Sequence, residues 1–244
     1  MKILEIETGH DIVKFYDESL YTGPDFFIKS SCPLDSVKYC FFFDSRAISG
    51  SWERSLLQML LNHFSGENWL AITRPLNLTI WPTLLNFLYK NKINPDLLIT
   101  NVGLVDFTPK KKLFVNNMIG QTKFFCPDYE PKMIPMEEYG LSDGTKERLF
   151  TLEYNDVITR KIKNTLSGFP VLTIKSPLVD SKIEIERKRP QSFFSQLVVT
   201  NNFIDELGFQ TINPGIFDTK LTYDAVHWTR QGNELIFNKI LENL

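Results

Sequence analysis

Three short polar segments of this 244-residue chain contain residue types that can do chemistry together. They are residues 44–45 (Asp-Ser), 101–106 (Asn-Val-Gly-Leu-Val-Asp) and 224–227 (Asp-Ala-Val-His). A serine hydroxyl becomes a good nucleophile when an imidazole takes its proton, and the imidazole needs a partner that holds it in one tautomer. Ser45, His227 and Asp224 are therefore candidates for a triad that performs acyl transfer, with Asp224 orienting His227.

A sheet of parallel strands would bring these segments together. Residues 37–43 form a dense β-type run, residues 52–64 place leucines at helical spacing, and residues 69–72 form a second apolar run. A helix is expected to begin after Pro82, and residues 96–102 indicate a buried strand. This alternation predicts a parallel sheet, and ligands bind at the carboxyl ends of the strands in such sheets. The polar residues after the strands are thus expected to face one site.

The rest of the chain continues the alternation. Residues 117–143 show neither period and are expected to form a long loop, followed by a helix over 145–166. A strand over 171–174, a helix from Pro190 to Leu207 ended by Gly208, and a last helix over 229–244 complete the pattern. We therefore predict one α/β domain over residues 1–244, a three-layer α/β/α fold with a mostly parallel central sheet. Residues 1–36 are expected to add a hairpin or an edge extension.

Each polar segment also has an ordinary structural explanation. Asp-Ser after a strand often caps a helix, and a single histidine near the start of a helix is more often structural than catalytic. The order of the segments favours the catalytic explanation over the structural one. It resembles the order of conserved blocks in the SGNH (GDSL-type) hydrolases, which read GDSL, a lone Gly, GxND and DxxH. The segment Asp224-Ala225-Val226-His227-Trp228-Thr229-Arg230-Gln231-Gly232 is similar to the DxxHxxxxG ending of that family.

The resemblance extends from about Val37 to Leu244 and implies a flavodoxin-like α/β fold that needs no cofactor. It also implies a serine esterase or O-deacylase that acts on a small-molecule or glycan ester. Ser45 would attack the ester carbonyl, and His227 would act as general base and then as general acid. An O-acyltransferase that uses the same triad is an alternative, and so is a catalytically degenerate binding module.

The chain departs from the family blocks at three places. The family has Gly where this chain has Phe43, and it has its oxyanion-hole Asn where this chain has Val105, so the role of that Asn is not carried over. The lone Gly is also missing around residues 74–79. Each oxyanion donor stabilises a transition state by about 3 to 4 kcal/mol. The N–H of Ser45 remains as one donor, and the candidates for a second donor are the side chains of Asn77 and Asn101 and the backbone beside Gly103.

Composition excludes several other classes. Apolar residues make up 43% of the chain and the formal net charge is −2, which predicts a globular protein without the positive field that nucleic acids need. No run approaches the roughly twenty apolar residues of a membrane helix, so no membrane insertion is expected. The three histidines and three cysteines lack metal-ligand spacing, and the acidic start of the chain lacks a signal peptide. These features predict a cytoplasmic enzyme without a metal.

Overall fold

The computed structural model describes residues 3–7, 12–16, 27–49, 55–73, 80–140, 144–180, 182–184 and 189–244. Its central sheet has six strands in the order β12-β10-β6-β4-β5-β3. These strands are β3 (Phe27–Ser30), β4 (Tyr39–Phe43), β5 (Trp69–Thr73), β6 (Leu97–Thr100), β10 (Val171–Ile174) and β12 (Gln210–Ile212). All neighbours pair in parallel except β3, which is antiparallel to β5 at the edge.

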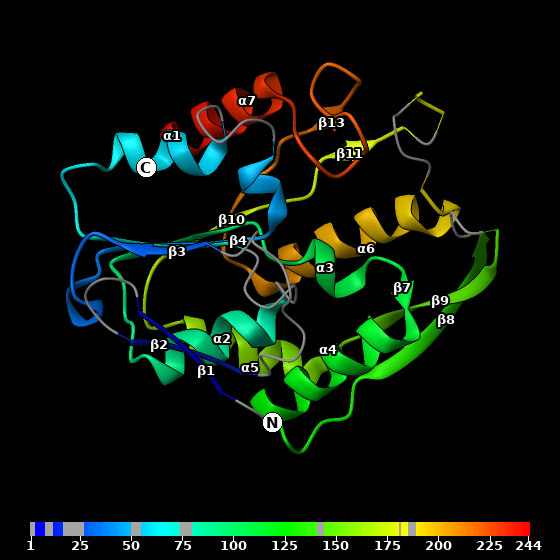
Figure 1. Ribbon diagram of the computed structural model, residues 1–244, viewed down its shortest axis with the longest axis horizontal. Coiled ribbons are helices and arrows are strands. Elements are labelled where there is room, and N and C mark those ends of the chain that lie inside the picture. Colours follow the sequence, from blue (N-terminus) through cyan, green and yellow to red (C-terminus); the bar gives the residue numbers. More distant parts are fainter. Residues whose placement is uncertain are drawn as a thin grey trace.

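The five parallel strands, numbered along the chain, lie in the order 2-1-3-4-5, which is the flavodoxin-like arrangement. Helices cover both faces of this sheet (Figure 1). They are α1 (Leu56–His63), α2 (Trp81–Lys90), α5 (Asp156–Leu166), α6 (Gln191–Leu207) and α7 (Arg230–Leu241). The predicted three-layer α/β/α fold with a mostly parallel sheet is confirmed.

Side-chain alternation in β4 explains the two layers. Phe41 and Phe43 pack into the core under α1 and α7, whereas Cys40 and Phe42 pack into the core over α2 and α5. All four side chains are fully buried, as expected for a central parallel strand that is covered on both faces. The unbroken apolar run therefore places β4 in the middle of the sheet.

The segment between β6 and β10 differs from the prediction. Residues 117–143 are not a loop, because α4 (Lys112–Phe125) and β8 (Lys132–Gly140) cover most of the described part of this range. The predicted helix over 145–166 is wrong in its first half, where β9 (Lys146–Glu153) pairs with β8 and with β7 (Lys110–Lys111). Leu149 and Leu152 in β9 are three residues apart, so they imitate the helical spacing that α5 then continues.

The described part of residues 1–36 contains a hairpin and an edge strand, where a hairpin or an edge extension is expected. β1 (Ile3–Glu7) and β2 (Ile12–Tyr16) form an antiparallel hairpin, and β3 extends the central sheet at its edge. Short elements complete the described chain: η2 (Leu34–Ser36), η3 (Ser45–Ile48), α3 (Leu104–Phe107), β11 (Leu178–Val179) and β13 (Ile216–Phe217). Among the described helices, none has the length and apolar character to cross a membrane. That residues 1–244 form one domain stays a prediction.

Candidate active site

The candidate site lies where the order of the parallel strands reverses. β4 is flanked by β5 on one side and β6 on the other, so the chain leaves β4 and β6 in different directions and opens a crevice at their carboxyl ends. Ser45 follows β4 as the first residue of η3, and Asn101 directly follows β6. Two of the three polar segments thus meet at the position where this fold class binds ligands.

The structure brings Ser45, His227 and Asp224 together. The Ser45 Oγ lies 3.3 Å from the His227 Nε2, although 182 residues separate the two in the chain. The His227 Nδ1 lies 2.9 Å from the Asp224 Oδ2, on the other side of the imidazole. Such a chain of contacts lets the imidazole take the serine proton while the carboxylate fixes its tautomer.

The loop that holds His227 is built by Asp224. The Asp224 Oδ1 accepts hydrogen bonds from the backbone N–H groups of Val226 at 3.0 Å and His227 at 2.7 Å. Ala225 takes the left-handed conformation with φ of 64°, which costs a residue with a Cβ of order 1 kcal/mol. The Thr222 hydroxyl donates to the His227 carbonyl oxygen at 2.8 Å and closes the loop. One carboxylate therefore shapes the backbone with one oxygen and orients the imidazole with the other.

Arg189 is a further partner of Asp224. Its Nη2 donates to the Asp224 Oδ2 at 2.7 Å and its Nε to the Asp224 carbonyl oxygen at 2.9 Å. Burial raises the pKa of the Asp224 carboxyl, but the hydrogen bonds from His227 and the charges of His227 and Arg189 outweigh it, so this pKa lies well below its ordinary value. Asp224 is therefore ionised at neutral pH. Nothing in the sequence around Arg189 indicated this contact.

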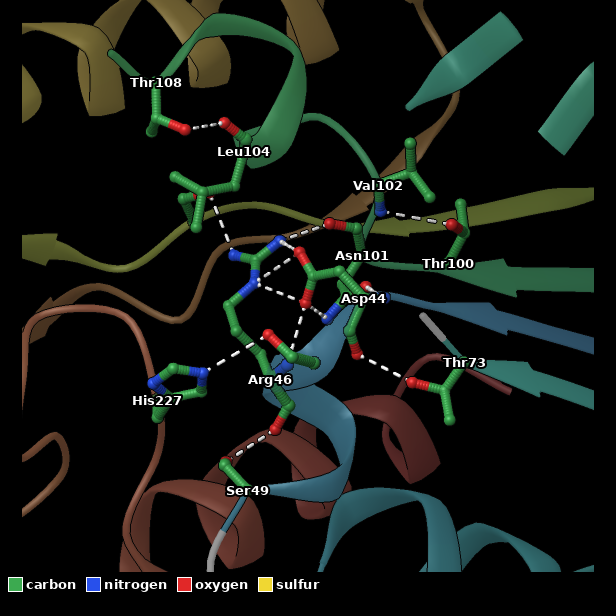
Figure 2. Close-up of polar contacts among 12 residues, drawn as sticks. Asp44, Arg46, Ser49, Thr73, Thr100, Asn101, Val102, Leu104, Thr108 and His227 are labelled. Atoms are coloured by element: carbon green, nitrogen blue, oxygen red, sulfur yellow. Dashed lines mark hydrogen bonds and ion pairs between the residues drawn. The ribbon is translucent and has the colours of Figure 1, made fainter. Parts of the chain in front are cut away.

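Beneath the nucleophile lies a buried ion pair. Arg46 is only 1% exposed, and its Nε donates to both carboxylate oxygens of Asp44 at 3.0 and 2.9 Å. The same guanidinium donates to the Asn101 carbonyl oxygen (Figure 2) and to the Ser176 hydroxyl at 3.0 Å. It also lies over the Trp228 ring. A buried arginine needs this many partners because an unpaired buried charge is costly. The network holds the residues on both sides of Ser45.

Asn101 belongs to this network. Its Oδ1 accepts the Asp44 N–H at 2.8 Å, its Nδ2 donates to the Asp44 Oδ1 at 2.9 Å, and the residue is fully buried. The side chain thereby joins the ends of β4 and β6. Asp44 takes one of the two N–H groups of its amide, and the expected oxyanion role of Asn101 stays a prediction. Asn77, the other side-chain candidate, lies outside the described residues.

Gly103 occupies a position that only glycine suits. It has φ of 133° at the start of α3, a conformation that residues with a Cβ rarely adopt. A Cβ there would lie 3.3 Å from the Ile204 Cδ1 and 3.4 Å from the Thr200 Cγ2 on α6. Gly103 thereby lets the chain turn from β6 into α3 close to α6. Its position beside the crevice agrees with the expected backbone role, and that role stays a prediction.

The departures from the family blocks also have structural consequences. Val105 is half-buried and packs against the apolar cluster that contains Ile80, Val115 and Met118, so no side-chain donor stands at this position. In the last block, a Cβ at Gly232 would overlap the Leu221 carbonyl oxygen, which explains why glycine is needed there.

Trp81 and Trp228 are fully buried in the core and do not offer surfaces for a sugar, while Trp52 lies outside the described residues.

A cavity of about 370 Å³ adjoins the triad. Arg189 and Val226, which contact or neighbour the triad residues, contribute to its wall together with Leu104 and Val105 of α3. Its other lining residues come from the segment before α4, from β8 and β9 and from the start of α6: Thr108, Pro109, Lys110, Lys111, Phe114, Tyr139, Leu149, Pro190 and Phe193. A cavity of this size exceeds what an acetyl group alone would fill, and pockets for small ligands begin near 300 Å³.

Comparison with known proteins gives similarity to solved structures only. No protein-family model matches the sequence, and no curated protein does either. The acetyl xylan esterase AlAXEase matches with 15% identity and a TM-score of 0.46, over 85% of this chain and 100% of its own. Est24, a carbohydrate acetylesterase from Sinorhizobium meliloti, matches with 12% identity and a TM-score of 0.44, over 85% and 100% of the two chains.

A variant of Axe2, an acetyl xylan esterase from Geobacillus stearothermophilus, gives a comparable match. Its identity is 10% and its TM-score 0.43, over 85% of this chain and 94% of its own. The strand order and the helices on both faces define the class of protein by themselves: a flavodoxin-like α/β domain, which is the fold that the resemblance to the SGNH hydrolases implies.

Proposed function

We propose that this protein is a serine hydrolase that cleaves carboxylic esters. The observation that carries the proposal is the chain of contacts from the Ser45 hydroxyl through His227 to Asp224, at 3.3 and 2.9 Å. Sequence-distant groups rarely adopt this order by chance, and it is the arrangement that activates a serine for acyl transfer. The intact geometry argues against a degenerate binding module.

The reaction follows from the positions of these groups. The Ser45 Oγ attacks the ester carbonyl carbon while the His227 Nε2 takes the hydroxyl proton. The bond to the alcohol oxygen then breaks as His227 returns that proton to the leaving alcohol, which leaves an acyl group on Ser45. Water attacks the acyl-enzyme with His227 again as base, so that the carboxylic acid is released and Ser45 is restored.

Backbone N–H groups supply the oxyanion donors in this proposal. Ser45 is the first residue of η3, and Leu104 is the first residue of α3, just after Gly103. The first N–H groups of a helix have no acceptor within it, so those at both starts are open to a developing oxyanion. This arrangement needs no side chain at position 105. A carbonyl oxygen held between the ends of β4 and β6 would meet both.

Ester turnover by the Ser45→Ala variant tests the proposal. Purified wild-type protein offered aryl esters of short carboxylic acids and acetylated sugars is expected to release acid, and Ser45→Ala is expected to abolish the release. Ser36→Ala is the matched control, because the Ser36 hydroxyl is exposed and, among the described residues, bonds to Asp35 alone. Mass spectrometry after treatment with a fluorophosphonate is expected to find the adduct on Ser45.

Other results would redirect the proposal. Hydrolysis that survives Ser45→Ala in a pure preparation contradicts the mechanism. Acyl exchange onto added sugars without release of acid would make the protein an O-acyltransferase with the same triad. A folded protein that neither reacts with the fluorophosphonate nor transfers an acyl group would leave the binding module as the better explanation.

A further inference from the structure

Three cationic side chains line the cavity beside the triad, and two of them are already neutralised. The Lys111 Nζ lies 3.0 Å from the Glu147 Oε2, and the Arg189 Nη2 lies 2.7 Å from the Asp224 Oδ2. Lys110 is the third. Its half-buried ammonium donates to the Thr108 carbonyl oxygen at 2.8 Å and to the Thr108 hydroxyl at 2.6 Å, and no carboxylate of the described chain lies within ion-pair distance of it.

The acidic groups around Lys110 do not cancel its charge. Asp44 and Asp106 act on the ammonium from a distance, but Asp44 already forms the buried ion pair with Arg46. Burial raises the pKa of the Asp106 carboxyl to about 7, so near neutral pH this group carries only part of a negative charge. Burial likewise lowers the pKa of Lys110 to about 7, against the pull of both carboxylates. A bound carboxylate would favour the protonated ammonium, because a nearby negative charge raises the pKa of a lysine.

We propose that Lys110 determines substrate specificity by binding a carboxylate that the ester substrate carries in addition to its ester group. This inference rests on the proposed function, because it names the substrate class of the same site. An ammonium has three donors, and Thr108 takes two of them, which fixes the nitrogen and leaves one donor for a ligand. Thr108 is itself held, since its hydroxyl donates to the Leu104 carbonyl oxygen at 2.8 Å (Figure 2).

Charge and shape favour a carboxylate over a phosphate. A single uncompensated positive charge matches one negative charge, whereas a phosphate dianion at this wall would keep an unpaired charge. Much of the cavity wall is apolar, with Leu104, Val105 and Val226 among its residues. Such walls suit a short hydrocarbon chain that joins the ester to the carboxylate. Monoesters of dicarboxylic acids have this form, and so do esters whose alcohol bears a carboxylate.

The selectivity between two esters tests the inference. The ratio of kcat/KM for the monophenyl ester of glutaric acid to kcat/KM for phenyl butyrate is measured for the wild type and for Lys110→Met. A hydrogen bond to a charged group typically contributes enough for about a tenfold effect, so the ratio is expected to fall about tenfold or more in Lys110→Met. Lys110→Arg keeps the charge and is expected to restore most of the ratio. Lys112→Met, at the exposed neighbouring lysine, is the matched control with an unchanged ratio.

A second series places the carboxylate on the alcohol side. If acetyl esters of hydroxy acids show the dependence on Lys110 and glutarate monoesters do not, the carboxylate belongs to the leaving group. An unchanged ratio in both series, in a Lys110→Met variant that unfolds at the temperature of the wild type, overturns the inference while ester hydrolysis stands.

A binding experiment tests this inference independently of the proposed hydrolysis. Calorimetric titration of Ser45→Ala with monomethyl glutarate and with dimethyl glutarate does not require turnover. Preferential binding of the monoester that Lys110→Met weakens about tenfold supports the inference even if the wild type hydrolyses no ester. Equal affinity of Ser45→Ala and of Ser45→Ala combined with Lys110→Met, both for monomethyl glutarate and for the acetyl ester of a hydroxy acid, overturns it, whatever the outcome of the hydrolysis experiment.

Discussion

Asp224, in the loop before α7, and Asp106, in α3, are both buried carboxyl groups, at 6% and 0% exposure. Asp224 receives two backbone N–H groups, the His227 imidazole and the Arg189 guanidinium. Asp106 receives the Trp81 N–H at 3.0 Å and the Tyr154 hydroxyl at 2.9 Å, both on its Oδ1. Its Oδ2 has no partner among the described residues.

The two pKa values move in opposite directions as a result. Burial raises both, and in Asp224 the donors and the positive charges outweigh burial, whereas in Asp106 they do not, so that its pKa reaches about 7. Burial of a carboxyl group therefore does not decide its charge. The hydrogen-bond donors and positive charges around the carboxyl group decide its charge. They keep Asp224 ionised beside His227, whereas Asp106 titrates near neutral pH.

Asp224→Asn is expected to have the largest effect. An amide in place of the carboxylate no longer fixes the tautomer in which the His227 Nε2 accepts the serine proton, and it does not stabilise the imidazolium. We expect kcat for ester hydrolysis to fall by about 10³- to 10⁴-fold, measured with a chromogenic ester. Asp218→Asn, at an exposed aspartate of the same loop region, is the control with unchanged kcat. Full activity in Asp224→Asn would mean that another group orients His227.

Asp106→Asn is expected to act on stability with a dependence on pH. The unfolded carboxyl ionises near 3.9 and the folded one at about 7, so the folded state binds more protons between these values and its free energy of unfolding falls as pH rises through this window. Asparagine is neutral at all pH values. Relative to the wild type, Asp106→Asn should gain about 2 to 3 kcal/mol between pH 5 and pH 8, because one pKa unit corresponds to about 1.4 kcal/mol.

Urea denaturation at pH 5 and pH 8 measures this gain. The exposed Asp128→Asn variant is the control, with the same small difference from the wild type at both pH values. A constant difference between Asp106→Asn and the wild type would show that Asp106 is ionised throughout, and the contrast with Asp224 would then be lost.

The parts of the fold that could be predicted from the sequence are those with uniform surroundings. β4, β5, β6 and β10 are buried on both faces and appear as apolar runs, and α6 ends at Gly208 with φ of 75°, where a glycine stop was expected. β8 and β9 lie partly in solvent, and a bulge between Pro135 and Glu138 interrupts their register. Alternation is therefore irregular there, and the sequence imitates a loop followed by a helix.

The candidate site also contains residues that could be predicted from the sequence and residues that could not. Ser45, Asp224 and His227 could be found because two of them share a short loop and all three follow a known order. Arg46 and Arg189 could not be found, since their partners lie in distant segments and no local spacing encodes such contacts. Lys110 is the first of three consecutive lysines, a pattern typical of a solvated loop, and the antiparallel pairing of β7 with β9 places it at the cavity wall.

Arg189→Met tests how far the Arg189 guanidinium stabilises the ionised Asp224. Arg189 is 13% exposed in its side chain and contributes to the low pKa of Asp224, so its removal should cost about 1 to 2 kcal/mol of unfolding free energy at pH 7. The depressed pKa stabilises the fold above about pH 4, and this contribution is lost as pH falls below that value. The variant should therefore approach the wild type at low pH. Arg148→Met removes an exposed pair with Glu138 at 3.6 Å and is expected to change stability by less than about 1 kcal/mol.

Tyr154→Phe is the smallest and most specific test, because it removes a single donor from Asp106. The Tyr154 hydroxyl lowers the pKa of Asp106 by favouring its ionised form, so its loss should raise that pKa further and move the fall in stability to higher pH. At pH 8, where the carboxylate is ionised, the variant should lose about 1 kcal/mol of unfolding free energy, and at pH 5 it should lose less. In the Asp106→Asn background the same substitution meets a neutral amide, so its cost should not depend on pH. A cost that is equal at pH 5 and pH 8 in the wild-type background would show that the Tyr154 hydroxyl stabilises the neutral and the ionised Asp106 equally, and Tyr154 would then not contribute to the pKa of Asp106.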